Sequence, residues 1–404
     1  MRLSPSGDCH LTYCTNIHPG ETWPEVYDNI KRYLPEVKRH IASGEDFGVG
    51  LRLSGIAADT LREPAVFDEL RDFLDTNGLY VFTINGFPYG PFHRTRVKEE
   101  VYLPDWQDEE RLRYTDLLAD LLAELLPQGR SLEGSVSTVP GAFKPRAQTP
   151  ETVTRIASLM VRHAAHLVRL KESTGRTIAL AIEPEPCCLL ETIEETVDFF
   201  ESHLFSRAAV QQLAKETGQQ GDTAEEALRH HIGVCLDLCH AAVEFEEPGV
   251  IVSRLSKAGI RIPKMQLSAG LRVMNVTQKT EQLLEPFNDD VYLHQVVERV
   301  ESQLNRYIDL PQAFGQLSAN GGDREWRVHF HVPIFLDDLG DFSSTQPFLR
   351  QILTQHRECA VSPHLEVETY TWDVLPERYR KEGVVPAIVR ELNWVKTQLA
   401  AATP

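Results

Sequence analysis

The sequence predicts an α/β protein in which eight parallel strands close into a (β/α)8 TIM barrel. Apolar segments of strand length alternate eight times with amphipathic segments of helix length, and no break in composition interrupts the 404 residues. A barrel usually takes about 250 residues, but insertions extend it beyond 400. A doubly wound open sheet is the alternative, yet no Gly-x-Gly-x-x-Gly motif follows the first strand and eight units exceed its normal count. We therefore expect a single barrel domain over residues 1–404.

The strands are expected where short runs rich in β-branched and aromatic residues end in polar residues or glycine. In chain order they are residues 10–17, 47–54, 79–86, 133–141, 177–186, 231–240, 262–270 and 364–372. The expected helices carry apolar residues at i, i+3 and i+4 spacing. They include residues 24–42, 60–76, 108–126, 149–172, 191–204, 248–258 and 377–400.

The extra length lies between the seventh and eighth strands. About 90 residues separate them, too many for a short barrel loop. They contain "VYLHQVV", "IDLPQAF" and "EWRVHFHVPIF". We expect residues 271–345 to be an insertion over the mouth of the barrel.

Alternation along the strands indicates which side chains face the barrel interior. In a closed parallel barrel one parity of each strand faces inward and the other packs against the helices. In "IALAIE" the parity of Ala179 and Ala181 also contains Glu183, and in "GVCLD" the parity of Gly233 and Cys235 contains Asp237. Small residues deep in the barrel followed by a polar residue at the carboxyl end are the pattern that an active-site mouth requires.

Four inward positions at consecutive strand ends are polar. They are Glu183, Asp237, Gln266 and Glu368. A single carboxylate at a strand end is commonly a helix cap or half of a surface ion pair. Polar side chains at the ends of four consecutive strands are harder to explain in this way, and the three carboxylates among them are costly to bury together without a cation. The sequence therefore predicts a divalent metal site for Mn²⁺, Mg²⁺ or Co²⁺, with Zn²⁺ favoured if a histidine joins.

Three histidines lie near this expected site. His240 follows Asp237 by three positions, so we expect it to reach a substrate oxygen or a second metal. His329 and His331 share one face of "RVHFHVPIF" and could enter the same site. The alternative is that both imidazoles are simply bonded within a packed strand.

The segment of residues 83–106 is rich in glycine, proline and aromatic residues, which is typical of a wall over a polar, sugar-sized ligand. A structured surface loop is the alternative. Asn85, His93, Arg96 and Lys98 are its polar residues. Elsewhere, Arg52 is expected to be an inward cation, and Glu185 in "EPEPCC" to contact substrate.

Composition excludes several classes of function. The formal charge of −18, without a basic stripe, argues against a nucleic-acid partner. No apolar run approaches the roughly 18 residues of a membrane span. The seven cysteines lack paired CxxC spacing and fit reduced core thiols. We expect a cytoplasmic protein with a small, polar substrate.

The motifs resemble those of a known superfamily. "AIEPEP", "LDLCH", "HFH" and "LEVET" are similar to strand ends of the xylose isomerase-like TIM barrels, which include sugar isomerases, ketose 3-epimerases and endonuclease IV. "HLTYCTNIHPGETW", "NGFPYGPFHRTRVKEEVYLPDW" and "HLEVETYTWDVLP" resemble the EboE family, the metabolite traffic proteins of the ebo gene clusters. The second similarity runs along nearly the whole chain. It implies a role in moving or maturing a secondary-metabolite precursor, with other ebo-cluster proteins as partners.

The resemblance also assigns roles to residues. It matches Glu183, Glu368 and Asp237 to the metal ligands of the superfamily and His240 to its DxxH histidine. A histidine usually stands where this chain has Gln266, and His331 could take that place. The resemblance implies an isomerase or epimerase in which Glu183 and Glu368 form the acid–base pair. A non-catalytic metabolite carrier and a metal-dependent phosphoester hydrolase are the alternatives.

Overall fold

A computed structural model describes residues 1–3, 9–93, 95–129, 131–317 and 323–400. Eight of its strands are parallel and neighbour one another in the order β2-β14-β8-β7-β6-β5-β4-β3. They are β2 (Cys9–Tyr13), β3 (Phe47–Arg52), β4 (Leu79–Asn85), β5 (Gly134–Thr138), β6 (Ile178–Ile182), β7 (Ile232–Asp237), β8 (Lys264–Leu267) and β14 (His364–Val367). The short β1 (Arg2–Leu3) pairs antiparallel with β2. All eight predicted strands are confirmed, each shorter than expected.

The barrel closes between β2 and β3. A parallel bridge joins Cys14 to Gly50. Beside it, the Thr12 hydroxyl donates to the Gly48 carbonyl at 2.7 Å and accepts from the Gly50 amide at 3.1 Å. The Thr12 side chain thus replaces ladder hydrogen bonds between β2 and β3. The prediction of a closed (β/α)8 barrel is confirmed.

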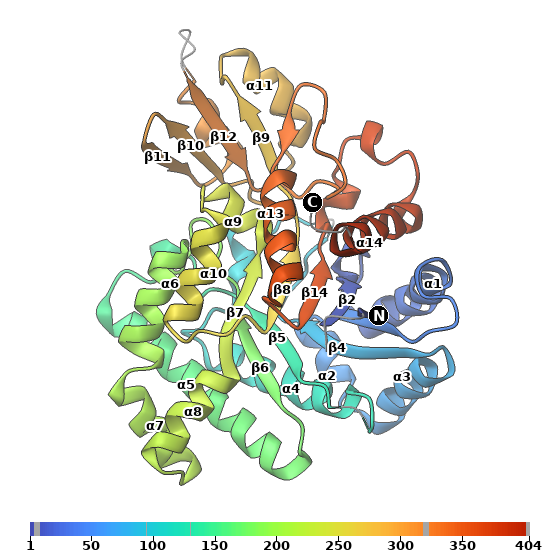
Figure 1. Ribbon diagram of the computed structural model, residues 1–404, viewed down its shortest axis with the longest axis vertical. Helices are drawn as coiled ribbons and strands as arrows, with labels where there is room; N and C mark the ends of the chain where they lie inside the picture. The colour runs from blue at the N-terminus through green and yellow to red at the C-terminus, as the bar shows by residue number, and fades with distance from the viewer. Residues whose placement is uncertain (4–8, 94, 130, 318–322, 401–404) are drawn as a thin grey trace.

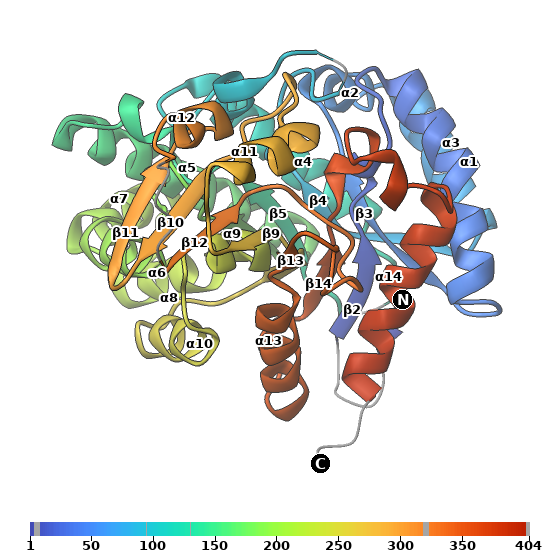
Figure 2. The same ribbon diagram turned by 90° about the horizontal axis from the view of Figure 1, so that it is seen from above.

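Helices surround the barrel (Figure 1, Figure 2). They are α1 (Trp23–Ile41), α2 (Gly55–Thr60), α3 (Pro64–Thr76), α4 (Glu109–Leu125), α5 (Pro150–Thr174), α6 (Ile193–Phe199), α7 (Arg207–Thr217), α8 (Gly221–His231), α9 (Leu238–Val243), α10 (Pro248–Lys257), α13 (Gln346–Glu358) and α14 (Val384–Ala400). All seven predicted helices are present. The helices α2, α7, α8, α9 and α13 were not predicted. No described helix is both long enough and apolar enough to cross a membrane.

A second, antiparallel sheet lies between β8 and β14 in the chain. Its strands run in the order β11-β10-β12-β9-β13. They are β9 (Leu271–Met274), β10 (Val296–Val300), β11 (Gln303–Tyr307), β12 (Arg324–Val328) and β13 (Ser343–Ser344), with α11 (Lys279–Leu284) and α12 (Leu310–Phe314) between them. Figure 1 shows this sheet and α11 at the end of the molecule away from α7 and α8. The residues of the expected insertion therefore build a sheet of their own.

The barrel interior is more polar than the sequence analysis predicted. Lys264 and Glu366 form an ion pair of 2.5 Å, and both side chains are fully buried. The Lys264 ammonium also donates to the Ser137 hydroxyl at 3.3 Å. A Cβ on Gly50 would lie 2.1 Å from Glu366 Oε1, so only glycine leaves room for this carboxylate. Small residues deep in the barrel were predicted for strands such as β6 and β7, whereas the charged pair that β8 and β14 contribute was not predicted.

A carboxyl group on α14 ties two loops at the mouth together. Glu391 Oε1 accepts from the Ile334 amide at 3.2 Å and from the Thr369 hydroxyl at 2.8 Å. Burial raises the pKa of Glu391 from 4.5 to about 7. The folded protein therefore binds this proton more tightly than the unfolded chain between these two pH values.

This raised pKa predicts a stability difference that depends on pH. As pH rises from 4.5 through 7, the folded state loses about 3 kcal/mol of relative stability from Glu391, at about 1.4 kcal/mol per pKa unit. Glu391→Gln keeps the acceptor oxygen and removes the titration. In urea unfolding, the free energy of unfolding of Glu391→Gln relative to the unmodified protein should rise by about 3 kcal/mol between pH 5 and pH 8. A difference that does not change with pH would contradict the assignment.

Candidate active site

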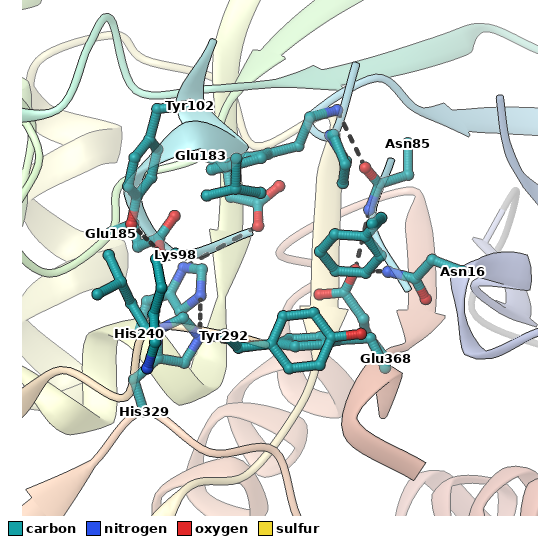
Figure 3. Close-up of a pocket in the computed structure, with 16 residues that line it drawn as sticks. Asn16, Asn85, Lys98, Tyr102, Glu183, Glu185, His240, Tyr292, His329 and Glu368 are labelled. Carbon is teal, nitrogen blue, oxygen red and sulfur yellow. Dashed lines mark hydrogen bonds and ion pairs between the residues drawn. The ribbon is translucent and has the colours of Figure 1, made fainter. Parts of the chain in front are cut away.

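A cavity of about 60 Å³ opens at the carboxyl ends of the barrel strands (Figure 3). This is several times the space that one buried water requires. Its lining residues come from the barrel, from residues 85–102 and from the second-sheet region. They are Asn16, Asn85, Phe87, Pro88, Phe92, Lys98, Val101, Tyr102, Glu183, Glu185, His240, Tyr292, Leu293, His329, Glu368 and Tyr370.

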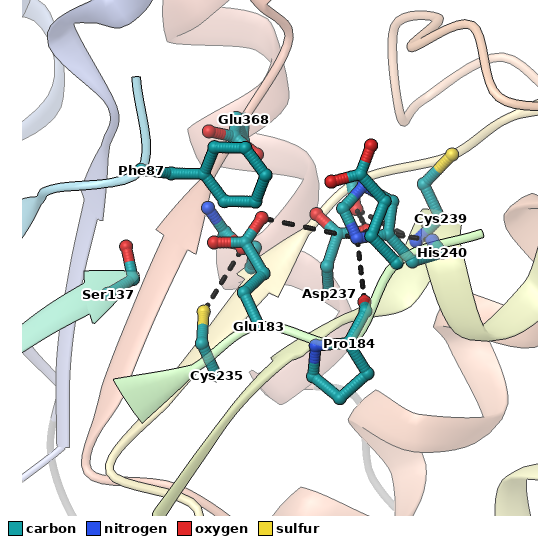
Figure 4. A network of polar contacts seen from close by, with 12 residues as sticks. Phe87, Ser137, Glu183, Pro184, Cys235, Asp237, Cys239, His240 and Glu368 are labelled. Carbon is teal, nitrogen blue, oxygen red and sulfur yellow. Dashed lines mark hydrogen bonds and ion pairs between the residues drawn. The ribbon is translucent and has the colours of Figure 1, made fainter. Parts of the chain in front are cut away.

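Three carboxylates converge beside this cavity (Figure 4). Asp237 is the last residue of β7, while Glu183 and Glu368 directly follow β6 and β14. One oxygen from each lies within 4.8 Å of the others, and all three side chains are buried. This separation is small enough for three ligands of one divalent ion.

Several atoms of this cluster are buried and have no hydrogen-bond partner among the residues that the structure describes. Glu183 Oε2, Asp237 Oδ2 and His331 Nε2 are among them. Asp237 and His331 are each held through their other side-chain atom, and Glu183 directly follows β6. Buried polar atoms are almost always paired, so unpaired acceptors that converge indicate a missing cation.

Neighbouring groups orient the ligand atoms. Asp237 Oδ1 accepts from the His240 amide at 2.8 Å and from the Ser268 hydroxyl at 2.9 Å. Asp237 therefore caps α9 with one oxygen and leaves the other free. His331 Nδ1 donates to the Glu368 carbonyl at 2.9 Å, which leaves the Nε2 lone pair for a metal.

Burial and mutual repulsion shift the pKa values of the cluster. Burial, followed by the charge of Glu368, raises the pKa of Glu183 well above 4.5. Burial, followed by the charge of Asp237, raises the pKa of Glu368 in the same way. Burial lowers the pKa of His331 to about 4, so its imidazole is neutral and able to bind a metal. A divalent cation would favour the ionised carboxylates and relieve their repulsion.

Gln266 stands next to Asp237 in the sheet register, as its position in the sequence predicts. Its Oε1 accepts from the Cys235 thiol at 3.1 Å, while its Nε2 has no partner within the described part of the chain. In this amide orientation the carbonyl oxygen is engaged by the thiol. His331 shares a group of potential ligands with Asp237 and His240 instead, so it offers an imidazole next to Asp237.

The other predicted histidines form a second group with Glu185. Ligand atoms of Glu185, His240 and His329 lie within 4.8 Å of one another, and so do those of Asp237, His240 and His331. His240 Nε2 and His329 Nε2 are 3.0 Å apart. The two groups share His240, so the predicted HxH pair does enter the same site as Asp237.

The structure brings some predicted substrate-binding residues to the cavity and not others. Asn85 lines it and donates to Glu368 Oε1 at 2.9 Å, alongside Asn16 at 2.8 Å. Lys98 lines it, but its ammonium is engaged by Asp309 at 2.8 Å.

Arg52 and His93 are not among the lining residues of the cavity. The Arg52 guanidinium is held by Glu21 at 2.9 Å and by the carbonyls of Gly20, Pro88 and Gly90. His93 Nδ1 lies 3.9 Å from Glu21 Oε1. Both residues thus lie against the Glu21 carboxylate, which supports the 88–92 segment.

The sequence analysis missed the aromatic wall of the cavity. Phe92, Tyr292 and Tyr370 form a small cluster of their own, with ring centroids 5.1–5.4 Å apart. These residues come from three segments that are distant in the chain. Their aromatic character was visible, but nothing in the local pattern brings them together.

No protein-family model and no curated protein matches the chain. Solved structures do match. A xylose isomerase-like TIM barrel protein from Mycobacterium smegmatis in complex with magnesium is 11% identical, with 98% of each chain covered and a TM-score of 0.52.

Two further structures match at lower TM-scores. The IolI protein with a bound zinc atom is 13% identical, with 96% of this chain and 97% of that one covered and a TM-score of 0.45. The probable 3-DHS dehydratase AsbF of Bacillus anthracis, involved in petrobactin synthesis, is 12% identical, with 96% and 98% covered and a TM-score of 0.45. These identities are low, and the likeness to the magnesium complex shows the fold alone, a TIM barrel.

Proposed function

We propose that this xylose isomerase-like barrel is a divalent-metal-dependent isomerase or epimerase of a sugar-like or cyclitol-like polyol, free or phosphorylated. The observation that carries the proposal is the buried group of Glu183, Asp237 and Glu368, whose carboxylate oxygens lie within 4.8 Å of one another. Asp237 also belongs to an adjoining group with His240 and His331. Such a donor set fits a divalent ion. Three oxygen donors favour Mn²⁺, Mg²⁺ or Co²⁺, and the imidazole extends the choice to Zn²⁺.

When bound, the ion would supply Lewis acidity toward a hydroxyl or carbonyl oxygen of the substrate. Glu183 and Glu368 lie on different strands and both line the cavity, so they can serve as the acid and the base that move a proton between carbons. Asn16 and Asn85 hold Oε1 of Glu368 and so fix the orientation of that carboxyl group. The wall of Phe92, Tyr292 and Tyr370 limits the access of water to the reacting carbons.

The biological setting rests on the similarity of the long motifs to the EboE family. We place the protein in the maturation or traffic of a secondary-metabolite precursor in the cytoplasm, alongside other ebo-cluster proteins. The cavity supports a small polar substrate because carboxylates, amides and imidazoles line one side of it.

Metal analysis tests this proposal directly. The purified protein is expected to hold about one divalent ion per chain, and chelation should abolish turnover. Turnover should return with Mn²⁺, Mg²⁺, Co²⁺ or Zn²⁺ in a screen of aldoses, ketoses, cyclitols and their phosphates. A protein that holds no ion and still binds a polyol would support a non-catalytic carrier instead.

A phosphoester hydrolase is the second candidate function. It is favoured by the second donor group of Glu185, His240 and His329 next to the first, since paired metal ions activate water for attack on phosphate. Two ions per chain and release of inorganic phosphate from a sugar phosphate would favour it over the isomerase.

A further inference from the structure

Gln295 is a buried residue at the junction of three segments of the site. It directly precedes β10 and is 1% exposed. Its backbone carbonyl accepts from the His329 amide at 2.8 Å. Its side chain contacts His329, Tyr102 and Glu185. The residue therefore links the second-sheet region to the 98–102 segment and to the loop after β6.

The surroundings fix the orientation of the Gln295 amide. Nε2 lies 2.9 Å from Tyr102 Oη, 3.1 Å from Glu185 Oε1 and 3.3 Å from the Pro186 carbonyl. A backbone carbonyl can only accept, and Tyr102 donates its own hydrogen to Glu185 at 2.7 Å. Turning the amide over would place its oxygen against these acceptors, so Oε1 faces His329 Nδ1 at 2.8 Å.

This orientation determines the tautomer of His329. Oε1 can only accept, so Nδ1 must carry the hydrogen, and Nε2 of the neutral ring is then an acceptor. His240 Nδ1 likewise donates to the Pro184 carbonyl at 3.0 Å. The lone pairs of the two Nε2 atoms thus face each other across 3.0 Å beside the cavity. Two acceptors this close require a donor from outside the pair. The Tyr370 hydroxyl lies 3.4 Å from His329 Nε2, which is long for a hydrogen bond, so there is still a place for a donor that approaches both Nε2 atoms.

We propose that Gln295 is a positioning residue that holds His329 in the Nδ1-protonated tautomer, so that His240 and His329 together accept a hydrogen bond from a hydroxyl group of the substrate. The expected effect of Gln295 on turnover rests on the proposed function, whereas the tautomer of His329 does not depend on it. If the amide were turned over, His329 would carry its hydrogen on Nε2 and donate it to His240. No acceptor would then remain for the substrate.

Nitrogen-15 NMR of the full-length, histidine-labelled protein tests the tautomer, with His329 assigned from His329→Asn. The unmodified protein should show Nδ1 protonated and Nε2 unprotonated. Gln295→Glu keeps an acceptor at Nδ1 and should preserve this tautomer, while Gln295→Met should lose it. Gln303→Met, at an exposed position of β11, is the matched control and should change nothing.

An Nε2-protonated His329 in the unmodified protein would overturn the proposal, whatever the variants do. So would an unchanged tautomer in Gln295→Met. With a polyol substrate, Gln295→Met should raise KM about 2- to 10-fold with kcat nearly unchanged, the effect of one lost hydrogen bond in binding. The metal content of the same samples distinguishes failure of this inference from failure of the proposed function. If the proposed function is wrong, the protein holds no divalent ion, but His329 keeps the Nδ1-protonated tautomer.

Discussion

Glu183→Gln is expected to lower turnover by about 10²- to 10⁴-fold while the protein stays folded. The substitution removes both a charged ligand atom and an acid–base group from the cluster. Gln has nearly the same volume, and Glu183 Oε2 has no hydrogen-bond partner to lose. Turnover of a polyol and bound metal should be measured on the same samples, with circular dichroism as the test of folding.

Glu368→Gln should have an effect of the same order, since Glu368 supplies the opposite member of the proposed acid–base pair. Glu194→Gln is the matched control because Glu194 is an exposed carboxylate on α6, where its side chain is 73% accessible. Normal turnover in either active-site variant would rule out the assignment. Loss of metal without loss of turnover would show that the carboxylates bind an ion that the reaction does not need.

Lys264→Met is expected to destabilise the protein by about 3–5 kcal/mol, the usual cost of leaving one member of a buried ion pair unpaired. The ammonium of Lys264 is fully buried, and no other described residue donates a hydrogen bond to the Glu366 carboxylate that could replace it. Urea unfolding should show the loss. Lys257→Met, at an exposed position on α10, should stay within about 0.5 kcal/mol of the unmodified protein.

A second substitution distinguishes lost pairing from lost packing. Lys264→Met combined with Glu366→Gln removes the uncompensated charge and should recover at least half of the lost stability. If the double variant is no more stable than Lys264→Met, the cost comes from packing, and the ion pair contributes little.

Much of the barrel was predictable because its signals are local. Strand-length runs of alternating parity located all eight parallel strands, and the same parity placed Glu183, Asp237 and Glu368 inside. The helices α7 and α8 give a weak signal because few of their residues are buried: Ala209 and Leu213 in α7, and Ala224, Leu228 and His231 in α8. The Lys264–Glu366 pair was missed because each residue looks like an ordinary surface charge in its own strand.

The sequence by itself determined the barrel, the strand ends and the acidic character of its mouth, since these follow from the period of apolar residues along single segments. Only the tertiary structure decided which residues meet there. Gln295 reaches His329, and Tyr370 reaches Phe92, across separations that no local pattern encodes. Arg52 faces Glu21 and three carbonyls because the 88–92 segment folds back over it. Strand parity fixes the side of the sheet that a residue occupies, whereas its partner depends on loops whose paths are set by packing.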